Sequence, residues 1–483
     1  MKKLLLLSAI LSTGLYAASI DHIQTYSPDY LANQAQTGMI NGVSTYYNPA
    51  GLGRLEKGKY FHAGLQFAHG HEKMSYGGKE HKAKLNQAIP NIALTFVDEK
   101  GATFFNFGGI AGGGDLEYDG VSGIDVLPDL AQFKPLGIYD KGSTLKGSNK
   151  YEQITLGRSF NVDDNLSFSV AGRLVHGTRK LNGNLNIGVN PTAQYKQAKA
   201  QQVAQEVSKA VDAATQGKGL SAAQIAAIKA QKTNEALTKL QQKVNDLNQN
   251  GLTGDIDSKR EAWGYGFQLG VNYKVNDKLN LAARYDSRVK MNFKAKGHEY
   301  QLQTTDILGQ TIGLSTFYPQ YTINSKVRRD LPAILSVGAS YKVTDNYLVS
   351  ASGNFYFNRQ AKMDRVKAFR GHQHGGDYKN GWEIALGNEY KLNDKFTLIG
   401  SVNYARTGAK NSSFNDTEYA LNSVTLGAGV RYRYDETLSF TASVAHFIYE
   451  KEDGNFKEKY KVNENQKYHK EITAFGLSVT KKF

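Results

Sequence analysis

Cysteine is absent from this chain of 483 residues, and proline is scarce, with 8 residues. Without cysteine, neither a disulfide framework nor a thiolate metal site can form. Beyond its first residues the chain also lacks any run close to the roughly eighteen consecutive apolar residues of a transmembrane helix. It carries no GxSxG, P-loop or HExxH motif, so nothing in it predicts an enzyme. If the chain spans a membrane, it must do so with strands.

The first residues have the order of features of an export signal. Lys2 and Lys3 are positively charged, and residues 4–15 form an apolar run that is too short to span a bilayer. Small residues follow at Ala17 and Ala18. We expect a cleavable signal peptide over residues 1–17, and cleavage after Ala18 fits equally well. The alternative is a buried N-terminal helix.

Aromatic residues and glycine are abundant, with 29 tyrosines, 22 phenylalanines and 49 glycines. Aromatic-rich strands with glycine turns suit a membrane β-barrel, in which only one face of each strand meets lipid. The formal net charge of +15 could indicate nucleic-acid binding, but export removes that partner. In a bacterial outer membrane, basic loops would instead face lipopolysaccharide phosphates or acidic ligands.

A repeated pattern of strand, short polar turn and strand runs along the chain. One copy reads LGRSFNVDDNLSFSVAGRL from Leu156, and another reads LGVNYKVNDKLNLAARYDS from Leu269. Further copies begin at Val337, Leu386 and Leu426, and there is a looser one at residue 92. Each copy predicts a β-hairpin, because its turn residues favour tight reversal.

Within these hairpins, apolar and polar side chains alternate. Trp263, Tyr265 and Phe267 share one face of a strand, while Gln268 and Asn272 share the other. Almost every strand repeats the pattern, with aromatic residues near its ends, as expected for a barrel that is apolar outside and polar inside. A secreted β-sandwich or passenger domain is the alternative, but its apolar face would need a second covering sheet.

The strand count predicts an all-β fold, a transmembrane antiparallel β-barrel of about fourteen strands over residues 59–483. Six hairpins supply twelve strands, and residues 59–68 and 472–483 supply the first and last. The six short turns would be periplasmic and the longer connections external, which places both termini in the periplasm. The terminal Phe483 resembles the assembly signal read by the barrel-assembly machinery.

Residues 194–250 differ from the barrel repeat, since they are rich in Ala, Gln and Lys. They predict two helices in the third external loop, broken at Gly217–Gly219, with Ser221 capping the second helix. The second helix has a narrow apolar stripe, which suits either helix-to-helix packing or ligand contact. The stripe is formed by Leu237, Leu240, Val244 and Leu247.

Residues 18–58 precede the first strand and lack strand alternation. Near their end Tyr46 and Tyr47 are followed by the motif Asn48-Pro49-Ala50-Gly51. An Asn-Pro turn alone is weak evidence. With an export signal, fourteen strands and a helical external loop, it resembles the NPA motif of the outer-membrane long-chain fatty-acid and aromatic-hydrocarbon transporters, the FadL/TodX family.

The resemblance implies that residues 18–58 form a hatch that plugs the barrel, because fourteen strands enclose more space than their own side chains fill. A hydrophobic compound, with long-chain fatty acids the first expectation, would pass from the external loops into the barrel. It would leave through a gap in the third strand, where Gly108, Gly109 and Gly112 are the candidates. The alternative is that these glycines only begin the second external loop.

Arg173 and Arg284 are the candidate contacts for a fatty-acid carboxylate, because alternation turns both toward the lumen. The alternative is structural pairing with Asp286, Glu383 or Glu389.

No cofactor or metal is expected. Asp115, Glu117 and Asp119 imitate the start of an EF-hand loop, but the twelfth position is Val126. His69/His71 and His372/His374 lack a third ligand. Two other functions compete with hydrophobic-compound transport: a general porin, and a surface adhesin that uses the basic loop 362–370.

Overall fold

The computed structural model describes residues 26–131, 133–296, 302–305, 311–312, 324–362, 366–367, 373–374, 378–414 and 419–483. The predicted signal peptide lies outside these residues, as do His372 and most of the basic loop 362–370. Among the described residues, no helix is both long enough and apolar enough to cross a membrane.

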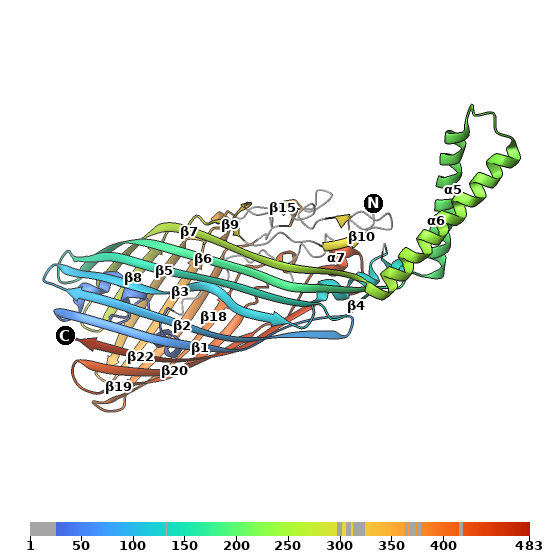
Figure 1. Cartoon of the computed structure of the whole chain (residues 1–483). Coiled ribbons are helices and arrows are strands. Elements are labelled where there is room, and N and C mark those ends of the chain that lie inside the picture. The colour runs from blue at the N-terminus through green and yellow to red at the C-terminus, as the bar shows by residue number, and fades with distance from the viewer. Residues whose placement is uncertain are drawn as a thin grey trace.

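The described chain forms a closed antiparallel barrel of fourteen wall strands, which confirms the predicted fold class (Figure 1). Each strand pairs with the next along the chain, and the last strand pairs with the first, with Tyr60 opposite Lys482. The wall strands are β1 (Gly58–Tyr76), β2 (Lys79–Val97), β3 (Gly101–Tyr118), β5 (Thr144–Asn161), β6 (Leu166–Val189), β7 (Leu252–Lys274), β8 (Leu279–Asp286), β13 (Ile334–Thr344), β14 (Tyr347–Tyr356), β17 (Gly381–Lys391), β18 (Phe396–Arg406), β19 (Ser423–Arg433), β20 (Leu438–Tyr449) and β22 (Lys467–Lys482).

Shorter strands extend this wall. Two of them, β9 and β12, pair with each other and continue the lines of β8 and β13. The others pair at the ends of longer strands or form a separate hairpin. Their bounds are β4 (Ile138–Asp140), β9 (Asn292–Lys296), β10 (Leu302–Thr305), β11 (Thr311–Ile312), β12 (Lys326–Arg328), β15 (Val366–Lys367), β16 (Gln373–His374) and β21 (Glu452–Asp453).

The wall is apolar outside and polar inside, as the alternation predicts. On β7, Tyr265 is 84% exposed and Leu269 is exposed, whereas Gln268 and Asn272 are buried in the lumen. The outward face continues on β22 with Leu477, which is 67% exposed. An exposed apolar belt around a closed barrel is the surface that lipid requires.

All six predicted short turns lie between consecutive wall strands, at residues 98–100, 162–165, 275–278, 345–346, 392–395 and 434–437. The first two strands are longer than the sequence indicated, since β1 and β2 have 19 residues each. They are joined at the opposite end by Gly77 and Gly78, both at positive φ, as a tight hairpin turn needs. Their outer halves were missed because charged residues replace the apolar ones there.

The insertion between β6 and β7 forms two helices, α5 (Ala193–Thr215) and α6 (Ala222–Asn250), as predicted. Ser221 caps α6, and its side chain forms a capping box with Gln224. The two helices pack along each other and project from the end of the barrel opposite the short turns (Figure 1). In the apolar stripe of α6, Val244 is buried and Leu247 packs against apolar residues at this end of the barrel.

Short helices cap the helical end of the barrel. An apolar cluster that includes Tyr76, Leu127, Phe133 and Phe456 joins several of them to the outer parts of the strands. These helices are α4 (Ser122–Asp125), η3 (Leu127–Asp129), η4 (Lys134–Leu136), η7 (Asn358–Gln360), η8 (Asn411–Ser413) and α7 (Phe456–Tyr460).

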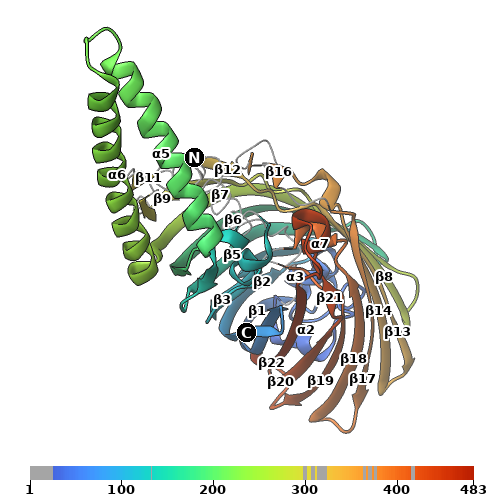
Figure 2. The same ribbon diagram turned by 90° about the vertical axis from the view of Figure 1, so that its right-hand side faces the viewer.

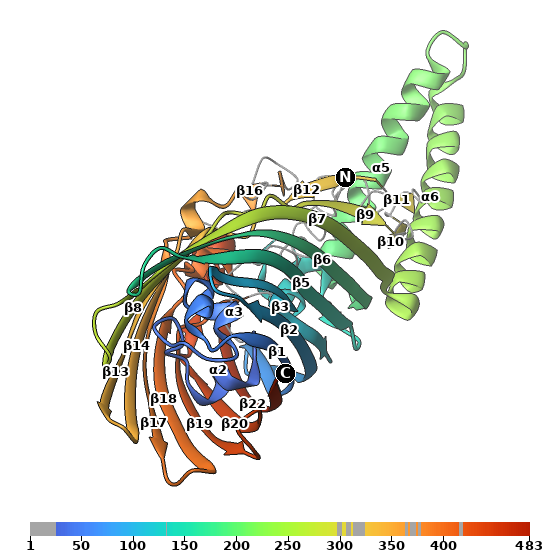
Figure 3. The same ribbon diagram turned by 90° about the vertical axis from the view of Figure 1, so that its left-hand side faces the viewer.

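The segment before β1 lies inside the ring of strands (Figures 2 and 3). Its described residues, 26–57, contain the helices α2 (Pro28–Ala32), α3 (Ser44–Tyr47) and η2 (Pro49–Arg54). Nearly all of these residues are buried, because wall strands surround them. We call this segment the hatch.

Candidate functional site

The Asn48-Pro49-Ala50-Gly51 motif builds the start of η2. Asn48 is the N-cap, and its side-chain oxygen accepts a hydrogen bond from the backbone N–H of Gly51 over 3.2 Å. Pro49 suits the first helical position, where its missing N–H costs nothing. A side chain at Gly51 would collide with the Asn48 amide and with Ile40. Asn48, Pro49 and Gly51 thus each have a local structural reason.

The motif also binds the wall. The amide nitrogen of Asn48 donates to Oδ1 of Asn272 on β7 over 2.8 Å. The hydroxyl of Ser167 on β6 donates to the carbonyl of Ala50 over 2.7 Å. Next to the motif, Asn106 on β3 donates to the carbonyl of Thr45 over 3.0 Å. Three separate strands therefore hold this part of the hatch.

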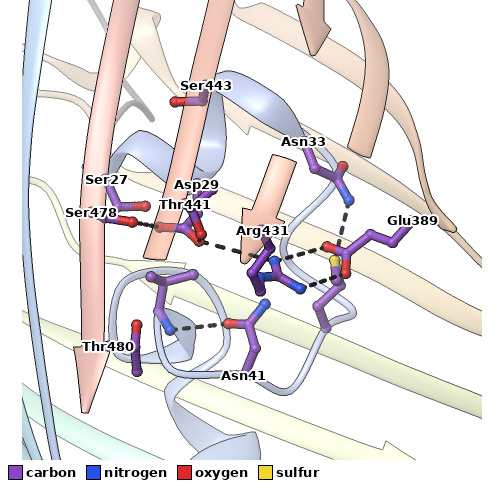
Figure 4. Close-up of polar contacts among 12 residues, drawn as sticks. Ser27, Asp29, Asn33, Asn41, Glu389, Arg431, Thr441, Ser443, Ser478 and Thr480 are labelled. Carbon is purple, nitrogen blue, oxygen red and sulfur yellow. Dashed lines mark hydrogen bonds and ion pairs between the residues drawn. The ribbon is translucent and has the colours of Figure 1, made fainter. Parts of the chain in front are cut away.

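A second attachment lies on the opposite wall, at Asp29 of α2 (Figure 4). One oxygen of Asp29 accepts from the hydroxyl of Ser478 over 2.8 Å, and the other accepts from Thr441 over 3.1 Å. Arg431 lies 4.0 Å from Asp29 and forms a tighter ion pair with Glu389, at 2.8 Å. Asp29 is thereby linked to β20 and β22 by hydrogen bonds and to β19 by charge.

Four tyrosines form the aromatic centre of the hatch. Tyr26 stacks with Tyr46 and Tyr47, with ring centroids 6.1 and 5.8 Å apart, and Tyr30 stacks on Tyr47 at 5.5 Å. The wall contributes Asn91, which donates to the Tyr46 hydroxyl over 3.1 Å. The sequence pointed to Tyr46 and Tyr47 beside the motif but missed Tyr26, Tyr30 and Asp29.

Both predicted arginine contacts lie in the lumen and pair with Asp286. Nε of Arg284 donates to Asp286 over 3.0 Å, and Arg173 lies 3.8 Å from the same carboxylate. Arg284 also donates to the backbone carbonyl of Tyr46 and thus touches the hatch. The two arginines and Asp286 are at most 6% exposed. This geometry favours the alternative reading of the two arginines, structural pairing with a carboxylate.

The predicted glycines of β3 lie where its pairing with β2 ends. The two strands pair up to Asn91 and Gly108, and beyond that point β3 pairs only with β5 among the described strands. The ladder with β5 shifts register twice between Gly109 and Gly114, and Gly112 has φ +121. Since β3 continues beyond them, these glycines belong to the strand and not to the following loop.

A cavity of about 210 Å³ lies between the hatch and the helical end. Its floor includes Tyr30 and Leu31, and its wall includes Gly112–Gly114 of β3. The cavity thus reaches the interrupted pairing of β3. Its other lining residues are Gln34, Gln66, Ala68, Glu72, Leu85, Gln87, Ile89, Glu383, Asn403, Ala405, Thr407, Ala420, Leu421, Ser423, Thr425, Phe447, Tyr449, Lys470, Ile472 and Ala474.

The lining of the cavity is mixed in character. Leu31, Leu421, Phe447 and Ile472 offer apolar surface. Neither Arg173 nor Arg284 is among the lining residues, so the structure does not bring the predicted arginines to this cavity. The lining contains one lysine, Lys470, near the outer end of β22. The sequence did not indicate it, because the predicted last strand begins at residue 472.

That lysine, Lys470, is already engaged. Its ammonium donates to Glu72 on β1 over 2.8 Å and lies 4.6 Å from the centre of the Tyr419 ring. The Tyr118 hydroxyl donates to the other oxygen of Glu72 over 3.3 Å. A buried ion pair with such partners is costly to break, because each charge alone would be left without solvent.

Two of the carboxylates that imitate the start of an EF-hand loop form ion pairs with lysines. Asp115 lies 2.9 Å from Lys150, and Glu117 lies 3.2 Å from Lys146. In the described part of the chain, no group of three or more His, Cys, Asp or Glu side chains could hold a metal ion.

Comparison with known proteins now places this geometry in a family. The model of the family described as outer membrane protein transport protein (OMPP1/FadL/TodX) matches residues 147–483.

Two curated relatives match shorter stretches. The 47 kDa outer membrane protein of Pasteurella multocida is 26% identical over 205 residues, 41% of this chain and 46% of that protein. Outer membrane protein P1 of Haemophilus influenzae is 26% identical over 196 residues, 39% of this chain and 38% of that protein. The chain thus matches less than half the length of these relatives.

Solved structures share the fold over nearly the whole chain. A FadL homologue from Pseudomonas aeruginosa superimposes with a TM-score of 0.64 at 14% identity, covering 96% of this chain and 99% of that one. The toluene transporter TbuX of Ralstonia pickettii gives 0.58 at 17% identity, covering 96% and 99%.

Proposed function

This chain belongs to the family of outer-membrane transport proteins described as OMPP1/FadL/TodX, and we propose that it admits hydrophobic compounds through its hatched barrel. The observation that carries the proposal is the cavity between the hatch and the helical end, which combines an apolar lining with contact to the interrupted strand β3. Members of the family are transport channels rather than enzymes.

The route begins between the external loops and continues into the cavity. From there a hydrophobic molecule leaves past Gly108, Gly109 and Gly112, where the β2–β3 backbone pairing ends. Movement of the hatch opens the way, and the stretch from Thr45 to Gly51, which includes the motif, is the part held by three wall strands. The glycines of β3 support lateral exit because they present no side chains that could fill the interrupted part of the wall.

Long-chain fatty acids are the finer candidate for the substrate. A carboxylate head inside the cavity would have to share Lys470 with Glu72, since Arg173 and Arg284 are held by Asp286. Fatty acid is accordingly one of several compounds to compare in the transport assay.

The two ends of the chain serve export and assembly in this proposal. Residues 1–17 act as the cleavable signal peptide that delivers the chain to the outer membrane. Phe483, which is 73% exposed beyond the end of β22, is the contact for the barrel-assembly machinery.

Lipopolysaccharide is the proposed lipid partner. Lys82 and Lys84 lie exposed on the outward face of β2, on the helical side of the apolar residues Ile92 and Leu94. Cations just beyond a lipid-facing belt fit the phosphates of an outer leaflet. Charge reversal of both lysines should lower the lipopolysaccharide that co-purifies with the protein, and unchanged lipid would argue against the contact.

The transport proposal is tested by uptake of a labelled hydrophobic compound into intact cells of a host that lacks its own channel for such compounds. Expression of this chain should increase accumulation relative to cells with the empty vector. An equal rate would contradict the proposal.

Conductance in planar bilayers separates the general porin, which would be open at rest, from a barrel closed by its hatch. Cell-binding assays with loop 362–370 deleted address the adhesin, and that loop lies mostly outside the described residues.

A further inference from the structure

The charges of the cavity do not suit a carboxylate. The charged residues in its lining are Glu72, Glu383 and Lys470. Lys470 and Glu72 are 2.8 Å apart and form an ion pair, which leaves the Glu383 carboxyl as the group without a cationic partner within ion-pair distance among the described residues. A second carboxylate brought into this space would meet like charges and would have to displace Glu72 from its lysine.

Three hydrogen-bond donors surround the Glu383 carboxyl. Asn354 and Tyr356 donate to one of its oxygens over 2.6 and 2.7 Å, and Asn403 donates to the other over 3.3 Å. These contacts fix the orientation of both amides, because a flipped amide would turn its oxygen toward the carboxyl oxygens. Asn354, Asn403 and Glu383 are all at least nine-tenths buried.

The orientation of these amides has a consequence for recognition. The side-chain oxygens of Asn354 and Asn403 point away from Glu383 and have no hydrogen-bond partner among the described residues. Asn403 and Glu383 both line the cavity. A buried acceptor without a partner is unfavourable, and a ligand that donates a hydrogen bond would relieve that cost.

The remaining lining accepts a hydrocarbon. Leu31 from the hatch and Leu421, Phe447 and Ile472 from the wall and loops provide apolar surface in the same cavity. The cavity thus combines an apolar part with a polar part whose charged group is a carboxyl.

From these contacts we infer that the cavity selects hydrophobic molecules whose head group donates hydrogen bonds, a hydroxyl or an ammonium, over molecules with a carboxylate head. The inference rests on the proposed transport function and narrows its substrate class. Glu383 and Asn403 receive the head group, and the apolar lining receives the chain.

The experiment compares three amphiphiles with the same saturated chain: dodecanol, dodecylamine and dodecanoate. Their uptake is measured in intact cells that express the full chain and in cells with the empty vector. Dodecanol and dodecylamine should each accumulate at least about tenfold faster than dodecanoate, since a hydrogen bond to a charged group is worth more than one factor of ten. The alcohol tests the hydrogen bond alone, and the amine adds charge.

Two substitutions test the residues. Glu383→Gln should reduce the preference for the donor heads by about tenfold, because the carboxyl becomes a neutral amide. Glu72→Gln should raise dodecanoate uptake, because it leaves Lys470 without its carboxylate. Glu471→Gln is the matched control, since this exposed carboxyl lies next to Lys470 but faces outward, and it should leave all three rates unchanged.

The outcomes separate the two proposals. If none of the three compounds enters faster than in empty-vector cells, the transport function itself is wrong. If the compounds enter but dodecanoate is fastest, the head-group inference is wrong while transport stands. If Glu383→Gln fails to fold, as judged by loss of the compact band in unheated gels, the wild-type preference and the Glu72→Gln variant decide the matter. Unchanged dodecanoate uptake in a folded Glu72→Gln variant would also overturn the inference.

Discussion

The side-chain amide of Asn48 in the hatch donates a hydrogen bond to Asn272 on wall strand β7, over 2.8 Å. Asn272 is itself held, because it exchanges hydrogen bonds with Asn280 on β8 over 3.0 and 2.8 Å. Asn280 also donates to the hatch carbonyl of Gly38 over 2.9 Å. One residue of the motif thus both caps a helix and attaches that helix to a preorganised amide pair on the wall.

Replacing Asn48 with alanine should therefore loosen the hatch without unfolding the barrel. The loss of the N-cap alone costs about 1 kcal/mol, and the loss of the bond to Asn272 adds to it. We expect a higher resting conductance in planar bilayers and an unchanged compact band in unheated gels. Asn245→Ala on the exposed face of α6 is the control and should change neither. Unchanged conductance in Asn48→Ala would mean that the other attachments suffice.

The topology is tested by inserted tags. The short turns lie at one end of the barrel and α5 and α6 at the other (Figure 1). A tag inserted at Gly217, between the two helices, should be accessible to antibody on intact cells. A tag at Asp277, in the short turn between β7 and β8, should become accessible only after the cells are permeabilised. The reverse pattern would overturn the assigned orientation.

The interruption of β3 is tested by two neighbouring glycines. Gly112 has φ +121, and a side chain there would be strained and would press on the backbone of β5. Gly113 has open space around its α-carbon. Gly112→Ala should therefore rearrange the bulge and slow uptake of hydrophobic compounds several-fold, whereas Gly113→Ala should have little effect. Equal uptake in the two variants would argue that the compounds do not leave at this bulge.

The arginine cluster gives a prediction about stability. Asp286 is buried between Arg173 and Arg284, so Asp286→Ala leaves two buried guanidinium groups without their carboxylate. Removing one partner of a buried ion pair costs about 3–5 kcal/mol. Urea unfolding of the purified barrel in lipid vesicles should show a loss of that order. Asp277→Ala, in an exposed turn, should cost no more than about 0.5 kcal/mol. A loss of uptake with full stability would instead support ligand-binding arginines.

The wall could be predicted from the sequence because its signals are local. Alternation through Tyr265, Phe267 and Leu269 and the polar turns specify strands, faces and register before any long-range contact is known. The outer halves of β1 and β2 could not, because the alternation is reversed there, with charged residues outside and apolar residues inside. Lys82 and Lys84 are exposed on β2, whereas Ala83 and Leu85 between and after them are buried.

The site was harder to predict, because its partners are distant in the chain. Asp29 meets Ser478, and Glu72 meets Lys470, across separations that no spacing rule links. Burial of Arg173 and Arg284 followed from alternation, but the carboxylate that engages Arg173 depends on the register with which β6 and β8 flank β7. The motif at Asn48 could be recognised in the sequence because one of its roles, capping η2, involves only neighbouring residues.

Deleting residues 20–55 tests the hatch as a whole. The wall should still close, because backbone ladders hold the strands and β1 pairs with β22 independently of the hatch. The wall groups that lose a hatch partner, such as Ser167, Asn272 and Ser478, are polar and can be hydrated by water entering the lumen. Resting conductance should rise, since the described lumen at that level is filled by the hatch.

Selective uptake should fall in the same deletion, because Tyr30 and Leu31 form part of the cavity lining. Deletion of residues 193–250 with a short linker is the control, since α5 and α6 project away from the barrel and their loss should leave conductance unchanged (Figure 2). A hatch deletion that cannot fold would make the segment a structural core. Unchanged conductance would mean that the external loops seal the pore. A greater leak with unchanged selective uptake would remove the case for a gated transporter, because a cavity without its floor would then work as well as the complete one.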